Sequence, residues 1–287
     1  MTSRRVQIVE VGPRDGLQSE PDMVPTEVKV RLIERLMDAG VQRIEATSFV
    51  SPAAVPQLCD AEAVLATIGR RTGVEISALV PNQRGLERAL AARVDRIAVF
   101  TSASETFAQR NIRRTVDESL VRFGPIVSAA TAAGIPVRGY VSMAWHCPYE
   151  GAVDPEATLA VVRRLDALGC DEIALADTVG QASPDEVTRL LDRVATAVAI
   201  ERVAVHLHDT RGWALANVEA AVHAGVRIFD GAVAGLGGCP FAPGSPGNVD
   251  TAELVAVLER LGLDTGIDLA KLADAAAVVR PMTRRAA

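Results

Sequence analysis

The feature that most constrains the fold is a regular alternation of short apolar runs with longer helical patterns. The runs start about 20 to 40 residues apart, which is the length of one strand, one helix and two loops. They are Val6–Val11, Arg43–Phe49, Glu75–Val80, Asp95–Thr101, Val137–Met143, Glu172–Leu175, Val203–His208 and Ile228–Val233. Because most of them are almost continuously apolar, we expect parallel strands that are covered on both faces.

The segments between these runs carry helix signals. Val28, Leu32 and Leu36 recur at helical spacing, for example, and their pattern ends at Gly40. Eight β/α units predict an α/β protein, a single (β/α)8 TIM barrel over residues 1–287, with an additional C-terminal helix at Asp268–Val279 on the barrel exterior. The alternative is an open doubly wound sheet, which is disfavoured because no Gly-x-Gly-x-x-Gly follows the first run.

Composition excludes several classes of protein. With 49% hydrophobic and 23% charged residues, the 287-residue chain has enough apolar mass for a large core and is not disordered. A net charge of -6 argues against a nucleic-acid partner, and the lack of an apolar run of about 18 residues argues against a membrane span. No signal-peptide pattern opens the chain, which predicts a cytoplasmic location and four reduced cysteines.

Polar residues interrupt the apolar pattern at the carboxyl ends of strands, where a barrel carries its active site. Arg14 and Asp15 follow the first run and lie between two glycines. This pair is either a pair of catalytic groups, a surface ion pair, or an arginine beside an aspartate that caps a helix. His206 and His208 lie two apart in the seventh run, so their side chains share a face. That spacing favours one shared metal over two separately hydrogen-bonded imidazoles.

A glycine-rich segment follows the eighth run. It contains Cys239, which is either a reactive thiol or incidental to a structural loop. Asn248 follows this glycine-rich segment. It is either a metal ligand or the N-cap of a helix that starts near Asp250. The other polar residues at strand ends are Glu45, Thr47, Ser48, Asp177 and Thr178.

The candidate ligands form a set of mixed nitrogen and oxygen donors. Asp15, His206, His208 and Asn248 include no thiolate, which favours a divalent metal such as Mg²⁺ or Mn²⁺, with zinc as the alternative. The only lysines, Lys29 and Lys271, fall in predicted outer helices, so no Schiff base is expected inside the barrel. Carbon–carbon chemistry here would use the metal and Arg14 to stabilise an enolate.

Several segments together resemble one family of enzymes. The chain is similar to the 3-hydroxy-3-methylglutaryl-CoA lyase family of metal-dependent lyase TIM barrels, from about residue 5 to 280. The segments that carry this resemblance are 9–18 (VEVGPRDGLQ), 44–52 (IEATSFVSP), 137–142 (VRGYVS), 205–210 (VHLHDT) and 233–240 (VAGLGGCP).

The resemblance implies a reaction and a role for each site residue. It implies cleavage of 3-hydroxy-3-methylglutaryl-CoA to acetyl-CoA and acetoacetate, an acyl-CoA substrate, a homodimer and a place in leucine breakdown or a more specialised pathway. The implied roles are metal ligation by Asp15, His206, His208 and Asn248, catalysis by Arg14, Asp15, Cys239 and His206, substrate binding by Arg14, Gln18, Ser48 and Thr178, and support by Glu45 and Asp177.

The chain departs from the family pattern at a few positions. Trp145 and His146 replace small or aliphatic residues, which indicates either altered packing at the rim or a reshaped acyl pocket. Pro246 stands in the glycine loop where the family has a small residue, and Ala174 stands where many members have serine. The chemistry is therefore better supported than the identity of the 3-alkyl group.

Three other functions compete with this one. The same chemistry on a longer 3-hydroxy-3-alkylglutaryl-CoA or related hydroxyacyl-CoA is one alternative. The condensing direction of related barrels is another, but it needs a second region for which we expect 287 residues to be too few. A catalytically silent barrel that serves as a binding scaffold is the third, and the intact set of candidate site residues argues against it.

Overall fold

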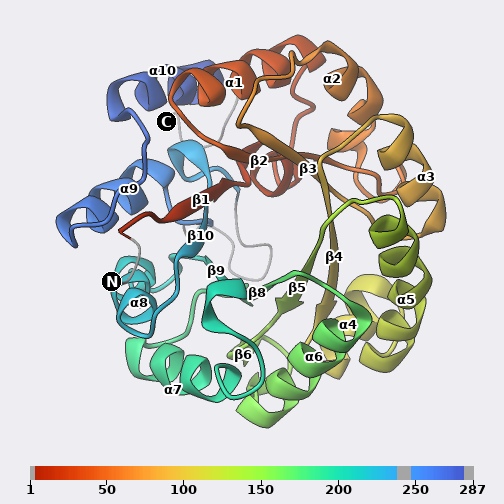
Figure 1. The fold of residues 1–287 in the computed structure, drawn as a ribbon, viewed down its shortest axis with the longest axis vertical. Helices are drawn as coiled ribbons and strands as arrows, with labels where there is room; N and C mark the ends of the chain where they lie inside the picture. Colours follow the sequence, from red (N-terminus) through yellow and green to blue (C-terminus); the bar gives the residue numbers. More distant parts are fainter. Residues whose placement is uncertain (1–3, 238–246, 281–287) are drawn as a thin grey trace.

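The computed structural model describes residues 4–237 and 247–280, and within them eight parallel strands close into a barrel (Figure 1). The strands lie in the order β1-β10-β9-β8-β5-β4-β3-β2, so the last strand pairs with the first. Their bounds are β1 Gln7–Glu10, β2 Arg43–Ser48, β3 Glu75–Leu79, β4 Arg96–Ser102, β5 Val137–Ser142, β8 Glu172–Asp177, β9 Val203–Leu207 and β10 Ile228–Gly231. The predicted TIM barrel and its strand positions are confirmed.

Helices form a ring around this barrel, as Figure 1 shows. Within the described residues they are α1 Thr26–Asp38, α2 Ala61–Thr67, α3 Gln83–Ala91, α4 Glu105–Ile112, α5 Val116–Ala132, α6 Pro155–Leu168, α7 Pro184–Val194, α8 Ala214–His223, α9 Thr251–Arg260 and α10 Leu269–Val279. The helix α10 packs against α1 and α9 on the outside of the barrel, so the predicted C-terminal helix is confirmed. None of the described helices combines the length and apolarity needed to cross a membrane.

Burial explains why the strand sequences are so apolar. Every residue of β8 and β9 is buried, because the helices cover one face and the packed interior of the barrel covers the other. The ends of two helices show regular capping chemistry. Ser183 and Glu186 form a reciprocal capping box at the start of α7, and α6 ends at Gly169 in the left-handed conformation that glycine favours.

A two-stranded antiparallel hairpin follows β5 and was not predicted. Its strands are β6 (His146–Cys147) and β7 (Gly151–Ala152). His146 Nε2 lies 3.1 Å from Glu186 Oε1, and the indole of Trp145 donates a 3.2 Å hydrogen bond to the Glu186 carbonyl. Both side chains thus anchor the hairpin to α7, and neither lines the cavity that contains Arg14, Asp15 and His206, which favours the packing interpretation of Trp145 and His146.

Candidate active site

Arg14 and Asp15 lie in a tight turn directly beyond the first strand. In this π-helical turn, η1 (Gly12–Gly16), the Val11 carbonyl accepts hydrogen bonds from the N–H groups of Arg14 at 3.1 Å and Asp15 at 2.7 Å. Gly16 is required because a Cβ there would lie 2.6 Å from the Cβ of Leu236. The turn therefore packs against the segment that follows β10. The side chains of Arg14 and Asp15 are directed into the barrel mouth.

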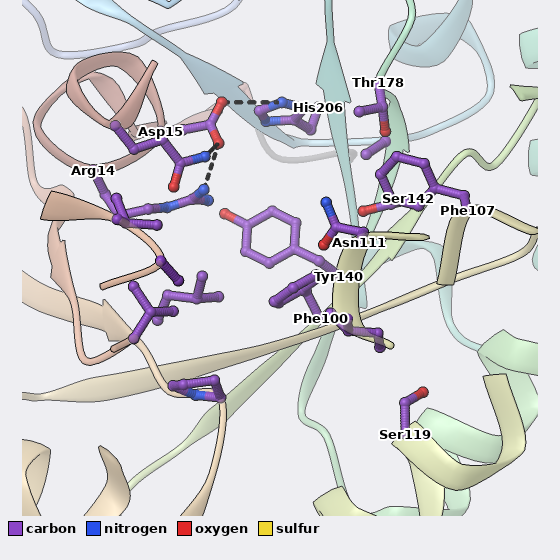
Figure 2. Close-up of a pocket in the computed structure, with 18 of the residues that line it drawn as sticks. Arg14, Asp15, Phe100, Phe107, Asn111, Ser119, Tyr140, Ser142, Thr178 and His206 are labelled. Carbon is purple, nitrogen blue, oxygen red and sulfur yellow. Dashed lines mark hydrogen bonds and ion pairs between the residues drawn. The ribbon is translucent and has the colours of Figure 1, made fainter. Parts of the chain in front are cut away.

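The three predicted protein ligands with ionisable side chains converge at this mouth. One ligand atom each from Asp15, His206 and His208 lies within 4.8 Å of the others. The distance from His206 Nε2 to Asp15 Oδ2 is 3.9 Å, as the dashed line in Figure 2 marks. The alternation of side chains along β9 and its extension at His208 places both imidazoles on one face, as predicted.

Asn248 completes this group from the other end of the chain. Its Nδ2 donates to Asp15 Oδ2 at 3.0 Å and to the Leu236 carbonyl at 3.1 Å. The N-cap of α9 is Asp250, whose side chain accepts from the N–H of Ala252. Asn248 therefore faces the site, and the alternative that it caps this helix is wrong.

The electrostatics of Asp15 and His208 suit a cation. Burial alone would raise the pKa of Asp15, but Arg14 and then His206 hold it well below its ordinary value. Burial and the neighbouring His206 lower the pKa of His208 to about 4, so its imidazole is neutral near pH 7. An ionised carboxylate and a neutral imidazole are the forms in which these side chains bind metals.

Three further side chains extend the site and were given no role from the sequence. The Tyr140 hydroxyl lies 2.9 Å from Glu45 Oε2 and 3.1 Å from Asp230 Oδ2. Asp230 in turn lies 3.0 Å from His206 Nδ1 and accepts a 2.6 Å hydrogen bond from Arg138. No motif marked Asp230, although a buried aspartate within an apolar strand was a visible signal.

The guanidinium of Arg14 lies between two carboxylates. Its Nε donates to Glu45 and its Nη1 donates to Asp15, and Figure 2 shows the Tyr140 hydroxyl directed toward it. Glu45 therefore lies in contact with Arg14, and its supporting role stays a prediction. A buried, fixed positive charge next to an open cavity is suited to stabilise an anion that forms there.

Arg14, Asp15, Tyr140, His206 and His208 line part of a cavity of about 610 Å³. Its lining also includes Gln18 and Thr178 and the aromatic rings of Phe100 and Phe107. Figure 2 labels Thr178, Phe100 and Phe107 around this cavity. Gln18 Nε2 donates to Asp15 Oδ1 at 3.0 Å, so this predicted substrate contact is also tied to the ligand cluster. The combination of a polar end and apolar walls is typical of a small-molecule site.

Other predicted site residues are placed differently. Ser48 does not line the cavity and its hydroxyl accepts from the N–H of Val50 at 3.2 Å. Asp177 accepts from the N–H groups of Gln181 and Ala182, so it shapes the loop after β8. Cys239 lies outside the described residues.

The residues present fit a divalent metal. The Nδ1 atom of His208 is buried and has no hydrogen-bond partner among residues 4–237 and 247–280, an arrangement that costs free energy unless a ligand satisfies it. The two amide protons of Asn248 are oriented by Asp15 and Leu236, and none of the described groups donates to its Oδ1. The donors are carboxylate, imidazole and amide groups, a set that Mg²⁺ or Mn²⁺ accepts.

Comparisons with a family model and with known proteins point to the same family. A family model described as HMGL-like matches residues 5–279. The chain is 51% identical over 270 residues to the cytoplasmic 3-hydroxy-3-methylglutaryl-CoA lyase of Danio rerio, covering 94% of this chain and 81% of that one. It is 49% identical over 276 residues to the mitochondrial hydroxymethylglutaryl-CoA lyase of Bos taurus, covering 96% and 85%.

The chain belongs to the HMGL-like family. Solved structures agree with this: the HMG-CoA lyase of Brucella melitensis has a TM-score of 0.96 at 49% identity, covering 98% of this chain and 99% of that one. The HMG-CoA lyase of Acinetobacter baumannii, in complex with coenzyme A and 3-methylmalate, has a TM-score of 0.93 at 40% identity, covering 98% and 92%. The resemblance found in the sequence is confirmed, and the cluster around Asp15 lies within the matched part of this HMGL-like chain.

Proposed function

We propose that this chain is a divalent-metal-dependent lyase that cleaves 3-hydroxy-3-methylglutaryl-CoA to acetyl-CoA and acetoacetate. One observation carries the proposal: Asp15, His206 and His208 converge beside the buried Arg14 at the end of one cavity. Membership of the HMGL-like family and relatives named as lyases support it. Coenzyme A in the structure of a relative supports an acyl-CoA substrate.

The reaction requires that the tertiary hydroxyl at C3 lose its proton. When bound, a divalent cation held by Asp15, His206, His208 and Asn248 supplies Lewis acidity that makes this hydroxyl more acidic. Asp15 is our candidate to accept the proton, and its Oδ2 lies 3.9 Å from His206 Nε2. The electron pair of the broken O–H bond then forms the ketone of acetoacetate.

Arg14 acts on the other product. When the C2–C3 bond breaks, its electrons pass to C2 and the thioester carbonyl, which becomes an enolate. The Arg14 guanidinium, held by Glu45 and Asp15, offers a fixed positive charge to that oxygen without reorganisation. Protonation at C2 gives acetyl-CoA, and Cys239 is our candidate for this acid.

A panel of thioesters tests the proposal. The chain is incubated with 3-hydroxy-3-methylglutaryl-CoA and with longer 3-alkyl homologues, with Mg²⁺ or Mn²⁺ and with a chelator, and products are identified by mass. Equal amounts of acetyl-CoA and acetoacetate, lost on chelation, are expected. Free coenzyme A with intact hydroxy acid would show thioester hydrolysis instead and would overturn the proposal.

Three finer assignments complete it. Mg²⁺ or Mn²⁺ is the proposed metal, a cytoplasmic homodimer is the proposed form of the enzyme, and one catalytic domain over residues 1–287 is the proposed organisation. The names of the relatives include both cytoplasmic and mitochondrial forms. Light scattering with chromatography gives the mass in solution, and a monomer would remove the dimer from the proposal.

A further inference from the structure

Asp230 connects two parts of the candidate site. Asp230 lies in β10 and is only 2% exposed. Its two carboxylate oxygens have different partners. Oδ2 lies 3.0 Å from His206 Nδ1 and 3.1 Å from the Tyr140 hydroxyl. Oδ1 accepts a 2.6 Å hydrogen bond from Arg138. A buried carboxylate with this set of partners has one fixed orientation.

The contact with Asp230 distinguishes the two nitrogens of His206. A neutral imidazole has one N–H group, and a carboxylate can only accept that proton. With the proton on Nδ1, directed at Asp230, the lone pair is on Nε2. That is the nitrogen that lies 3.9 Å from Asp15 Oδ2 and faces the ligand cluster. The geometry is that of a carboxylate–histidine–metal triad.

Arg138 makes this arrangement robust. Its side chain is buried, and it lies between Asp230 on β10 and Glu172 on β8, with Nε 3.1 Å from Glu172 Oε1. Because arginine stays protonated inside proteins, a permanent positive charge always faces Asp230. Asp230 is therefore in its carboxylate form, which can only accept a hydrogen bond, where it contacts His206.

We propose that Asp230 is a positioning residue that holds His206 in the tautomer protonated on Nδ1 and thereby presents Nε2 to the divalent cation. The inference rests on the proposed metal-dependent function. Asp230 is not among the residues that line the cavity, and it is not part of the proposed ligand set. Asp230 acts by setting the orientation and basicity of one metal ligand, His206. Loss of such an indirect contact typically lowers metal affinity roughly 10-fold to 100-fold.

Metal affinity of matched variants tests the proposal. Asp230→Asn keeps the size of the side chain and removes its charge. Glu172→Gln is the control, because it removes the other carboxylate from Arg138 and leaves His206 untouched. Free Mn²⁺ is measured by electron paramagnetic resonance in titrations of the wild type and both variants, and folding is checked by circular dichroism.

The expected result is Mn²⁺ binding weakened roughly 10-fold to 100-fold in Asp230→Asn and unchanged in Glu172→Gln. Equal affinity in folded Asp230→Asn and wild type overturns the inference while leaving the proposed function intact. An equal loss in both variants also overturns it, because Asp230 would then act only through the packing of Arg138. No Mn²⁺ binding by the wild type overturns the metal site and this inference together.

A measurement on the wild type serves if Asp230→Asn does not fold. The chain has four histidines, which makes assignment of ¹⁵N-labelled imidazoles practicable. At neutral pH without metal, we expect the His206 signals to show a proton on Nδ1 and none on Nε2. A proton on Nε2 instead overturns the inference.

Discussion

Asn248 donates a 3.0 Å hydrogen bond from Nδ2 to Oδ2 of Asp15, although 233 positions separate the two residues in the chain. The bond exists because the barrel closes, which places β10 beside β1 and the segments that follow them in contact. Gly237, with a φ of +93°, makes the approach possible, since a Cβ there would lie 2.9 Å from Asn248 Nδ2. The candidate ligand set therefore depends on the closed fold and not on any one segment.

Metal binding should stabilise the fold. At a free Mn²⁺ concentration about 100 times the dissociation constant, mass action adds about 2.7 kcal/mol to the free energy of unfolding, which raises Tm by several degrees. His208→Ala should abolish this rise, whereas His223→Ala, at an exposed site on α8, should retain it. Differential scanning fluorimetry with Mn²⁺ and with chelator measures both. A rise that survives in His208→Ala would show that the metal binds elsewhere.

Loss of Arg14 should act on turnover more than on substrate binding. Arg14→Gln removes the preorganised cation from the enolate oxygen, and we expect kcat to fall roughly 10²-fold to 10³-fold. Glu45 and Asp15 also lose their ion-pair contacts with Arg14, so the variant should be less stable. Arg14→Lys is the matched control because it keeps the charge and loses the planar fork. Near-normal kcat in a folded Arg14→Gln variant would remove Arg14 from the proposed mechanism.

Glu10 should give stability an unusual pH dependence. Its carboxylate accepts from the N–H groups of Gly12 and Val233 and from the Thr251 hydroxyl, and it is fully buried. Burial raises its pKa from 4.5 to about 7, so the folded state holds its proton at pH values where the unfolded chain has lost it. This contribution is present in full below pH 4.5 and is lost as the pH rises to about 7.

Glu10→Gln isolates this effect. At about 1.4 kcal/mol for each pH unit, the wild type should lose about 3 kcal/mol relative to the variant over that interval. Urea unfolding of both proteins between pH 4.5 and 8 measures the difference, and the other titrating groups cancel between them. A difference that stays constant with pH would show that the carboxyl is ionised in the fold throughout.

No covalent imine should form during turnover. Lys29 lies in α1 with its Nζ 2.6 Å from Asp60 Oδ1, and Lys271 lies on α10, so neither lysine of the chain lines the cavity. Borohydride added with the substrate should therefore leave activity unchanged and add no mass to the chain. A stable adduct on either lysine would contradict the proposed enolate chemistry.

Much of the fold was predictable because burial on both faces of a strand leaves a plain signal. The apolar runs located all eight barrel strands, and the helical spacing of Val28, Leu32 and Leu36 located α1. The hairpin β6–β7 was missed because strands of two residues leave no periodic pattern. Its side-chain anchor, His146 to Glu186, joins residues 40 positions apart and has no local signature.

The candidate site was predictable where its residues lie in short polar segments. Asp15 and the pair His206 and His208 interrupt strand ends, and the barrel rule then brings them together. Asp230 and Tyr140 were not predicted because their roles arise only from contacts between strands that are distant in sequence. The two residues that share one hydrogen bond here are 90 positions apart in the chain. Ser48 was placed at the substrate by resemblance, but its hydroxyl serves the loop after β2.

The most direct test measures bound metal and cleavage in the same samples. Metal-free chain is titrated with Mn²⁺, and bound Mn²⁺ by electron paramagnetic resonance is recorded beside the rate of acetyl-CoA release from 3-hydroxy-3-methylglutaryl-CoA. We predict that both rise together and saturate at about one ion per chain, and that both are lost in His208→Ala. Cleavage that proceeds at full rate before Mn²⁺ binds, or that persists in His208→Ala, would contradict a metal-centred lyase built on Asp15, His206 and His208.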